Sequence, residues 1–364
     1  MPGNIISWII SNWNRKIEHR EEIDQLKSIL EDFEPDVIHI FGTESWLCHV
    51  VKMTDRPCVV HLQGLLQPCV NALIPAGISK YDLMKYNWMH FIKGISLWHQ
   101  QQIVEKKSRR EYLFLKEIRF FMGRTLWDKS ISGFLSINST YFHVDEVLRD
   151  QFYTAKPWKY HPSSRVLITS TLSDNLYKGL DLVIKTASIL VKEQFKFEWR
   201  VVGVKNDSKS ALLLKKIYPS AYSSIGISLL GIKDTDEIID LLSETSLYIH
   251  TSNIDNSPNS LCEAQLMGVP VIATNVGGVS SLVEDGNDGF LVPANDPYFL
   301  AARIFQLYNN QIVLKNISER GREKAQKRHS HERILNQLLQ TYRHLTVNQS
   351  NNNFNVRIHP ILIR

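Results

Sequence analysis

The segment DNSPNSLCEAQLMGVPVIATNVGG spans residues 255–278. Its first nine residues contain two carboxylates and the start of a predicted helix. Pro258 suits the first helical position and Ser257 its N-cap. The free N–H groups of such a first turn can bind a phosphate. A carboxylate one turn further along can accept hydrogen bonds from ribose hydroxyls. The order Asp255, helix start, Glu263 therefore suits a sugar joined through a diphosphate to a nucleoside.

Spacing alone does not separate a ligand site from ordinary structure. Asp255 is equally suitable as a turn residue, and Glu263 as a solvated helix carboxylate. The residues that follow favour a ligand, because Gly277 and Gly278 come just after a buried strand at 269–273. Consecutive glycines there allow a ligand to approach the backbone closely.

A lysine in the preceding part of the chain supports the same site. Lys178 and Gly179 lie at the start of a predicted helix that follows a strand at 166–169. A lysine in that position can neutralise a diphosphate as a compact point charge. A Lys-Gly pair taken alone is a weak signal, so it supports a diphosphate site only together with the segment at 255–278.

The elements that must position these residues alternate between strand and helix, which predicts a parallel α/β organisation. In the first half we expect a helix at 18–33, strands at 37–41, 58–62 and 134–137, and a helix that begins near Asp145. In the second half, strand and helix alternate from residue 165 to residue 309, and one or two basic helices follow. Residues 156–164, with two prolines and no periodicity, are expected to link the halves.

A long basic and aromatic segment, residues 78–123, interrupts the first half. One interpretation is a surface for an anionic lipid headgroup or a polyanionic acceptor. The other, which we favour on sequence, is a solvated amphipathic helix with a buried aromatic face. Its aromatic and basic residues are Trp88, Trp98, Lys106, Lys107, Arg109, Arg110, Lys116 and Arg119.

Bulk composition is that of a globular protein, with 364 residues, 43% hydrophobic and 22% charged. A net charge of +5 is too small to indicate a nucleic-acid partner. The four cysteines form no CxxC pair and no metal-ligand spacing, which favours a reducing compartment. We identify no signal peptide and no membrane span, so a cytoplasmic location is expected, with peripheral contact at the inner face of the membrane as an option.

Together, Lys178-Gly179, the seven-residue spacing between Asp255 and Glu263, and GVPVIATNVGG resemble the family 4 glycosyltransferases, a retaining group with the GT-B fold. The pattern covers residues 165–345. NSPNSLCEA and YKGLD resemble the bacterial surface-polysaccharide branch, and GRTLWD (123–128) and YFHVDEVLRDQFY (141–153) do so more weakly. The resemblance implies two Rossmann-like domains facing across a cleft.

The domain boundaries follow from this resemblance. Residues 1–159 are expected to form an acceptor-side domain and residues 160–330 a nucleotide-sugar donor domain. Residues 331–346 are expected to form a C-terminal helix, and the polar tail 347–364 to be disordered.

The implied reaction is a hexosyltransferase reaction: transfer of a sugar from a UDP- or GDP-linked donor to a hydroxyl of a glycan or lipid-linked acceptor, with retention and with no cofactor or essential metal. It would serve the synthesis of surface polysaccharides such as capsule or lipopolysaccharide. Carried over residue by residue, Lys178 would stabilise the leaving diphosphate, Asp255 the donor sugar and Glu263 the ribose. The other donor-side residues are Gly179, Asn256, Ser257, Pro258, Asn259, Ser260, Leu261, Gly277 and Gly278, and those on the acceptor or donor-sugar side are Gln63, Gly64 and Arg124.

Four departures from the family pattern bear on activity. Asp255 replaces a glutamate, Thr171 or Leu172 stands where an arginine is usual, and Gln63 stands where many members have a histidine. The family's first strand and glycine-rich loop are not found, so the N-terminal domain is expected to be incomplete. A non-catalytic nucleotide-sugar-binding relative, or a truncated inactive transferase, is therefore an alternative. A nucleotide-sugar epimerase is a third and weaker hypothesis.

Overall fold

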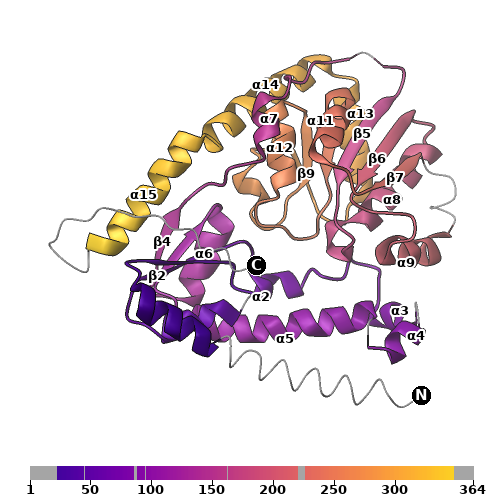
Figure 1. The fold of residues 1–364 in the computed structure, drawn as a ribbon. Coiled ribbons are helices and arrows are strands. Elements are labelled where there is room, and N and C mark those ends of the chain that lie inside the picture. Colours follow the sequence, from indigo (N-terminus) through magenta and orange to yellow (C-terminus); the bar gives the residue numbers. More distant parts are fainter. Residues whose placement is uncertain are drawn as a thin grey trace.

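The computed structural model describes residues 23–44, 46–85, 88–94, 96–161, 163–219 and 226–347. These residues form two α/β domains, each built on a parallel sheet, and a long C-terminal helix that joins them (Figure 1). The predicted α/β organisation is therefore confirmed. The start of the helix expected at 18–33, and all but the first residue of the tail expected to be disordered, lie outside the described residues.

The first sheet has four parallel strands in the order β1-β2-β3-β4. Its strands are β1 (Ile38–Phe41), β2 (Cys58–His61), β3 (Phe120–Gly123) and β4 (Thr140–His143). Around it lie a helix at 23–33 and the elements η1 (Trp46–Lys52), α2 (Leu66–Val70), α5 (Leu97–Leu115) and α6 (Leu126–Leu135). The short helices α3 (Lys80–Lys85) and α4 (Trp88–Ile92) lie at the start of α5, and α7 (Asp150–Thr154) packs against helices of the second domain (Figure 1). The core of this domain includes Val60, Phe121 and Leu115.

The prediction of a strand at residues 134–137 is wrong, because this apolar run consists of the last two residues of α6 and the two residues that follow. Phe134 and Ile137 are 79% and 86% exposed. Thr125 and Asp128 form a capping box that starts α6, and this local signal favours a helix over a strand. Short apolar runs do not separate the two states by periodicity. The strand of this unit is β4, a few residues later, and the next helix, α7, begins five residues after Asp145.

The described residues of the basic and aromatic segment 78–123 form α3, α4, α5 and β3. An amphipathic helix was expected there, but the two short helices and the strand were not. Its longest part, α5, is amphipathic as expected, with Phe114 and Leu115 buried. Leu113 is nevertheless 65% exposed, so the apolar residues of α5 are not all on the buried face.

The second sheet has six parallel strands in the order β10-β9-β8-β5-β6-β7. Its strands are β5 (Val166–Thr171), β6 (Phe197–Val202), β7 (Ile227–Gly231), β8 (Leu247–His250), β9 (Val271–Thr274) and β10 (Phe290–Val292). Its helices are η2 (Leu176–Lys178), α8 (Leu180–Lys192), α9 (Lys209–Ile217), α11 (Thr235–Glu244), α12 (Asn259–Met267), η3 (Val279–Ser281), α13 (Pro297–Tyr308) and α14 (Gln311–Arg328). All residues of β8 and β9 are buried, as expected for parallel strands covered on both faces. Neither α9 nor β7 was expected from sequence.

Two connections hold the domains together. The segment between α7 and β5 has no helix or strand in its described residues, but Trp158 is buried and its indole N–H donates to the carbonyl of Thr245 at 2.6 Å. Helix α15 (His331–Val347) runs from the second domain back to the first (Figure 1). There the Tyr342 hydroxyl lies 2.7 Å from Nδ1 of His39. The C-terminal helix is thus part of the first domain's packing.

We expect the protein to lose stability in mild acid through His61. This side chain is buried, stacks on His39 with ring centroids 5.4 Å apart, and neither ring nitrogen has a partner among the described residues. Burial, then His39 and Arg124, lower the pKa of His61 from 6.5 to about 3. The unfolded chain therefore binds a proton as the pH falls below 6.5, while the folded chain does not until about pH 3, so folding stability is lost across that window.

Thermal unfolding followed by circular dichroism at several pH values measures this effect. From about pH 7 to about pH 5, His61 alone should cost on the order of 1–2 kcal/mol. His61→Phe should reduce the pH dependence by that amount, while buried His39 and His329, whose pKa values are also lowered, still contribute to it. His161→Gln, at an exposed position between the domains, should leave the dependence unchanged. An unaltered pH dependence in His61→Phe would contradict the assignment.

Candidate active site between the two sheets

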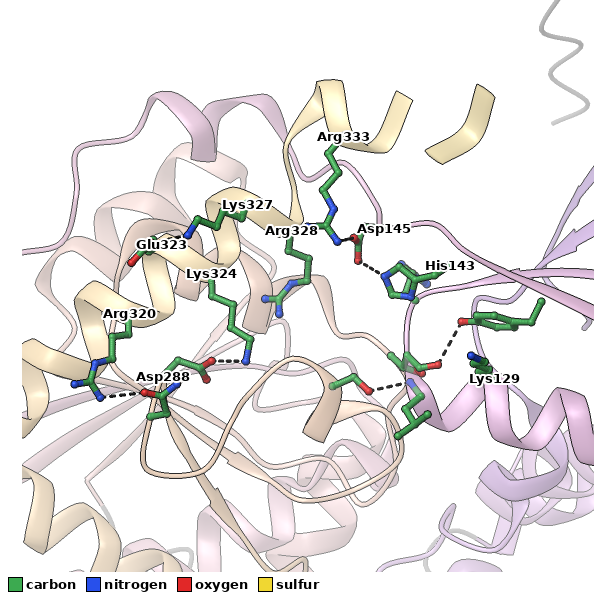
Figure 2. A pocket seen from close by; sticks show the side chains of 16 residues that line it. Lys129, His143, Asp145, Asp288, Arg320, Glu323, Lys324, Lys327, Arg328 and Arg333 are labelled. Carbon is green, nitrogen blue, oxygen red and sulfur yellow. Dashed lines mark hydrogen bonds and ion pairs between the residues drawn. The ribbon is translucent and has the colours of Figure 1, made fainter. Parts of the chain in front are cut away.

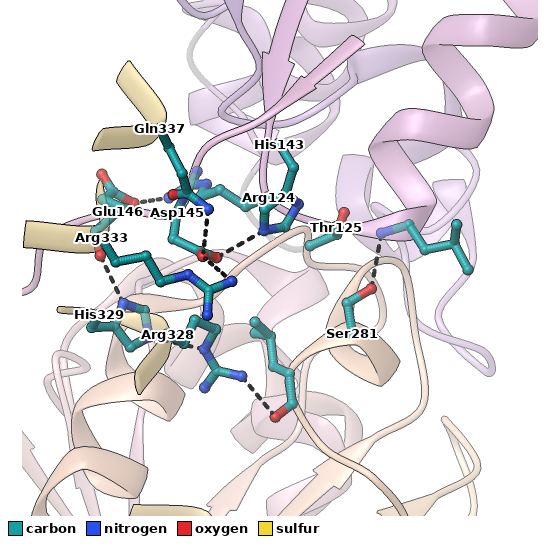
Figure 3. A network of polar contacts seen from close by, with 12 residues as sticks. Arg124, Thr125, His143, Asp145, Glu146, Ser281, Arg328, His329, Arg333 and Gln337 are labelled. Atoms are coloured by element: carbon teal, nitrogen blue, oxygen red, sulfur yellow. Dashed lines mark hydrogen bonds and ion pairs between the residues drawn. The ribbon is translucent and has the colours of Figure 1, made fainter. Parts of the chain in front are cut away.

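The two domains touch at the first turn of α6 and the loops that follow β8 and β9. The Thr125 hydroxyl donates to the Asn256 side-chain oxygen at 2.7 Å, and the Asn256 amide nitrogen donates to Asp128 at 3.0 Å. The backbone N–H of Leu126 donates to the Ser281 hydroxyl at 2.9 Å, and Figure 3 shows Ser281 beside this turn. The candidate site residues lie along this contact, at the carboxyl ends of the strands, where open α/β sheets bind ligands.

Lys178 and Asp255 form an ion pair at this edge of the second sheet. Lys178 Nζ lies 2.6 Å from Asp255 Oδ2, and the same oxygen lies 3.2 Å from the Ser252 hydroxyl and 3.4 Å from His250 Nε2. Burial alone would raise the pKa of Asp255, but the contacts with His250 and Lys178 outweigh it and hold that pKa well below its usual range. Both side chains are therefore charged, and the lysine expected to bind the diphosphate lies beside the carboxylate expected to bind the donor sugar.

Gly179 lets the chain turn into α8 directly behind this pair. Its φ is +83°, and a Cβ there would collide with the backbone oxygen of Thr251. No other residue fits without moving the strand end that leads to Asp255. Lys178 and Asp255 are thus brought together by a turn that requires glycine.

The glycine pair after β9 packs against protein. A Cβ on Gly277 would collide with the carbonyl oxygen of Asp255, and one on Gly278 would lie 2.6 Å from the side chain of Thr125. The N–H of Gly278 also donates to the Asp255 carbonyl at 2.9 Å. These glycines therefore allow close packing of the Asp255 loop and of α6, and their predicted closeness to a ligand stays a prediction.

Glu263 is held by an arginine that the sequence pattern did not single out. The carboxylate, buried on α12, accepts from Nε and Nη2 of Arg149, both at 2.7 Å. The third guanidinium nitrogen donates to the Thr235 hydroxyl at 3.0 Å. The hydrogen bonds from Arg149 to Glu263 are the main reason that the pKa of Arg149 is raised. The carboxylate expected to bind ribose is thus occupied by Arg149 in this structure.

Helix α12 begins one residue later than expected. Its N-cap is Pro258 in an extended conformation, and the predicted N-cap Ser257 is wrong. The N–H of Leu261 already donates to the Pro258 carbonyl at 3.1 Å. Among the described residues, nothing accepts from the N–H groups of Asn259 and Ser260, so these two are the donors available to a phosphate.

Gln63, Gly64 and Arg124 lie together at the ends of β2 and β3, on the first domain's side. Arg124 Nη2 donates to the Gln63 side-chain oxygen at 3.1 Å, and Arg124 Nη1 pairs with Glu146. Next to Gly64 there is open space within 4 Å of where a Cβ would lie. The structure therefore groups residues that are 61 positions apart in the chain.

Glu111 of α5, a second residue that no local pattern marked, holds the Gln63 loop in place. It accepts from the N–H groups of Leu66 and Gln67 at 2.8 and 3.1 Å, and from the hydroxyl of Thr43. Burial raises the pKa of Glu111. The side chain faces inward from the basic segment, where the sequence does not distinguish it from the other glutamates among the lysines and arginines.

In the described part of the chain, no helix is both long enough and apolar enough to cross a bilayer. Within those same ranges, His, Cys, Asp and Glu side chains nowhere gather in threes as a metal site would need.

Comparison with known proteins finds similarity in the second domain. Residues 163–310 match the family model described as Glycosyl transferases group 1. An uncharacterized glycosyltransferase of Methanocaldococcus jannaschii is 31% identical over 152 residues, 41% of this chain and 40% of that protein. A putative colanic acid biosynthesis glycosyltransferase of Salmonella typhimurium is 27% identical over 168 residues, 44% of this chain and 41% of that protein. The chain thus spans about two fifths of the length of these relatives.

Solved structures are similar over both domains. Sucrose-phosphate synthase from Thermosynechococcus elongatus aligns with a TM-score of 0.70 at 16% identity, over 91% of this chain and 78% of that one. Anabaena HepE, solved in complex with UDP and glucose, aligns with a TM-score of 0.65 at 17% identity, over 88% of this chain and 81% of that one. The two-domain GT-B fold predicted from sequence is therefore confirmed.

Proposed function

We propose, on the premise that residues 163–310 form a glycosyl transferases group 1 domain, that the protein transfers a sugar from a nucleotide diphosphate sugar to a hydroxyl. The acceptor is a glycan or a lipid-linked glycan of a surface polysaccharide, and the anomeric configuration is retained. The matches to proteins named for colanic acid and capsular polysaccharide biosynthesis support this class of acceptor.

The observation that carries the proposal is the ion pair of Lys178 and Asp255, with Gln63 and Arg124 on the first domain's side. As the bond between the donor sugar and its diphosphate breaks, negative charge grows on the leaving phosphate, which Lys178 would stabilise. The acceptor oxygen bonds to the same sugar carbon, and its proton leaves with the diphosphate. Asp255 binds donor-sugar hydroxyls, and Glu263 binds the ribose after Arg149 has moved.

Nucleotide release from a panel of UDP- and GDP-sugars, with and without a lipid-linked acceptor, tests this function. UDP-glucose is a reasonable first member, because HepE was solved in complex with it. We expect release that depends on the acceptor and that continues in the presence of a metal chelator. Binding of a nucleotide sugar without release under any condition would favour the non-catalytic alternative.

We also propose that the outer face of α5 contacts an anionic membrane during transfer to a lipid-linked acceptor. This face combines apolar Ile103 and Leu113, 52% and 65% exposed, with exposed Lys106 and Lys107. Figure 1 shows α5 along an outer edge of the first domain. Apolar side chains beside lysines are typical of helices that lie on anionic lipid.

Co-sedimentation with vesicles tests this contact. We expect binding to vesicles that contain phosphatidylserine and little binding to pure phosphatidylcholine. Replacing both Lys106 and Lys107 by glutamine should weaken binding by roughly 30-fold, since each lysine near the surface contributes about 1 kcal/mol. Lys192→Gln, on the exposed end of α8, is the control. Equal binding by the double variant and the control would exclude this face.

A further inference from the structure

A cavity of about 790 Å³ lies between the domains, beside the contact of α6 with the second domain. Its walls come from α6 and β4 on one side and from η3, α14 and the start of α15 on the other (Figure 2). The volume is in the range of pockets that bind small molecules. Thr125 lines the cavity and, through its hydrogen bond to Asn256, adjoins the loop that carries Asp255.

The lining of this cavity is positively charged. Seven of its side chains are Lys or Arg and three are Asp or Glu. Each of the three carboxylates pairs with a lining cation: Asp288 with Lys324 at 2.5 Å, Glu323 with Lys327 at 2.6 Å, and Asp145 with Arg333 at 3.6 Å. The positive charge left over must therefore come from the other lining residues.

Among the described residues, three lining cations lack an acidic partner: Arg328, which is buried and bonds to neutral groups, and two exposed cations on opposite sides. Among the described residues Lys129 of α6 has no acidic partner, and Arg320 of α14 donates only to the neutral side chain of Asn287, at 3.0 Å. Figure 2 shows Lys129 and Arg320 at opposite ends of the cavity. One compact anion would not reach both, whereas an extended ligand with several negative groups would.

A buried arginine connects the cavity with the candidate active site. Arg124 lines the cavity, is 5% exposed, and its Nη2 donates to Gln63. Its Nε has no partner within the described ranges. A buried guanidinium N–H without an acceptor is costly, and a small shift of the Arg124 side chain toward a ligand oxygen at this wall would satisfy it.

We propose that this cavity binds an anionic segment of the acceptor glycan, one that carries sugar carboxylates or phosphates. The inference rests on the proposed function, because the bound segment would lie next to the donor site and present a hydroxyl to it. Lys129 and Arg320 belong to different domains, so the ligand would also hold the domains together. Carboxylates and phosphates both present anionic oxygens that accept hydrogen bonds from Lys and Arg.

Isothermal titration calorimetry on the full chain tests the proposal with three probes: trigalacturonate, a glycerol phosphate trimer and neutral maltotriose. We expect at least one acidic trimer to bind, and its identity distinguishes carboxylate from phosphate. Lys129→Gln and Arg320→Gln should each weaken that binding by roughly fivefold, and together by roughly 25-fold if they act independently. Lys192→Gln should leave it unchanged.

The proposal is overturned if neither acidic trimer binds, if maltotriose binds as tightly, or if the double variant binds like the wild type. These results are separate from the test of transfer, because binding is measured without a donor. A chain that binds the trimer but releases no nucleotide would contradict the proposed function and leave the cavity assignment standing. UDP affinity in the double variant should equal that of the wild type, which shows that the donor half is intact.

Discussion

Lys178→Met should lower kcat by roughly 10²- to 10³-fold, the usual effect of removing one group that stabilises transition-state charge. The lysine lies 2.6 Å from Asp255, at the carboxyl ends of the strands where the donor's diphosphate is expected. Its charge should be needed most when the leaving phosphate gains charge, so KM should change less than kcat. Steady-state nucleotide release at saturating acceptor measures both constants.

The chain offers a matched control for this variant. Lys185 of α8 also pairs with an aspartate, Asp181, at 2.8 Å, but it contacts none of the candidate site residues. Lys185→Met removes the same kind of ion pair and should lower stability while leaving kcat nearly unchanged. Thermal unfolding of both variants separates loss of folding from loss of chemistry. Equal losses of kcat in the two variants would contradict the role of Lys178.

Glu263→Ala and Arg149→Ala should change nucleotide affinity in opposite directions. In Glu263→Ala two ribose hydroxyls lose a charged acceptor, so the Kd for UDP should rise by roughly 10- to 100-fold. The rate of sugar transfer should fall by a similar factor. In Arg149→Ala the carboxylate is free before the nucleotide arrives, so the Kd should fall by a few fold. The gain is small because the Arg149 side chain is 42% exposed and its pair with Glu263 is partly screened.

Calorimetry with UDP, and with GDP as the second base, measures these affinities. Arg200→Ala is the matched control, since Arg200 pairs with Glu198 at 2.8 Å on β6 and should not affect nucleotide binding. Weaker binding in Arg149→Ala would show that the arginine helps to hold the nucleotide. Arg149 and the ribose would then not compete for Glu263.

Local chemistry explains which features could be predicted from the sequence. The alternation of strands and helices follows from hydrophobic periodicity over a few residues. The turn at Lys178-Gly179 and the loop after β8 each depend on neighbours in the chain, so their place at strand ends was predictable. The misplaced strand at residues 134–137 shows the limit, since a capping box outweighed an apolar run.

The sequence by itself determined two α/β halves and a set of candidate residues at the carboxyl ends of their strands. Only the tertiary structure decided which of those residues meet. Arg149 and Glu263 are 114 positions apart, and Thr125 and Asn256 are 131 apart. Such pairs depend on how distant parts of the chain pack together, because no periodicity or local hydrogen bond links residues at that separation. The cavity lined by Lys129 and Arg320 exists for the same reason, since each domain supplies only part of its wall.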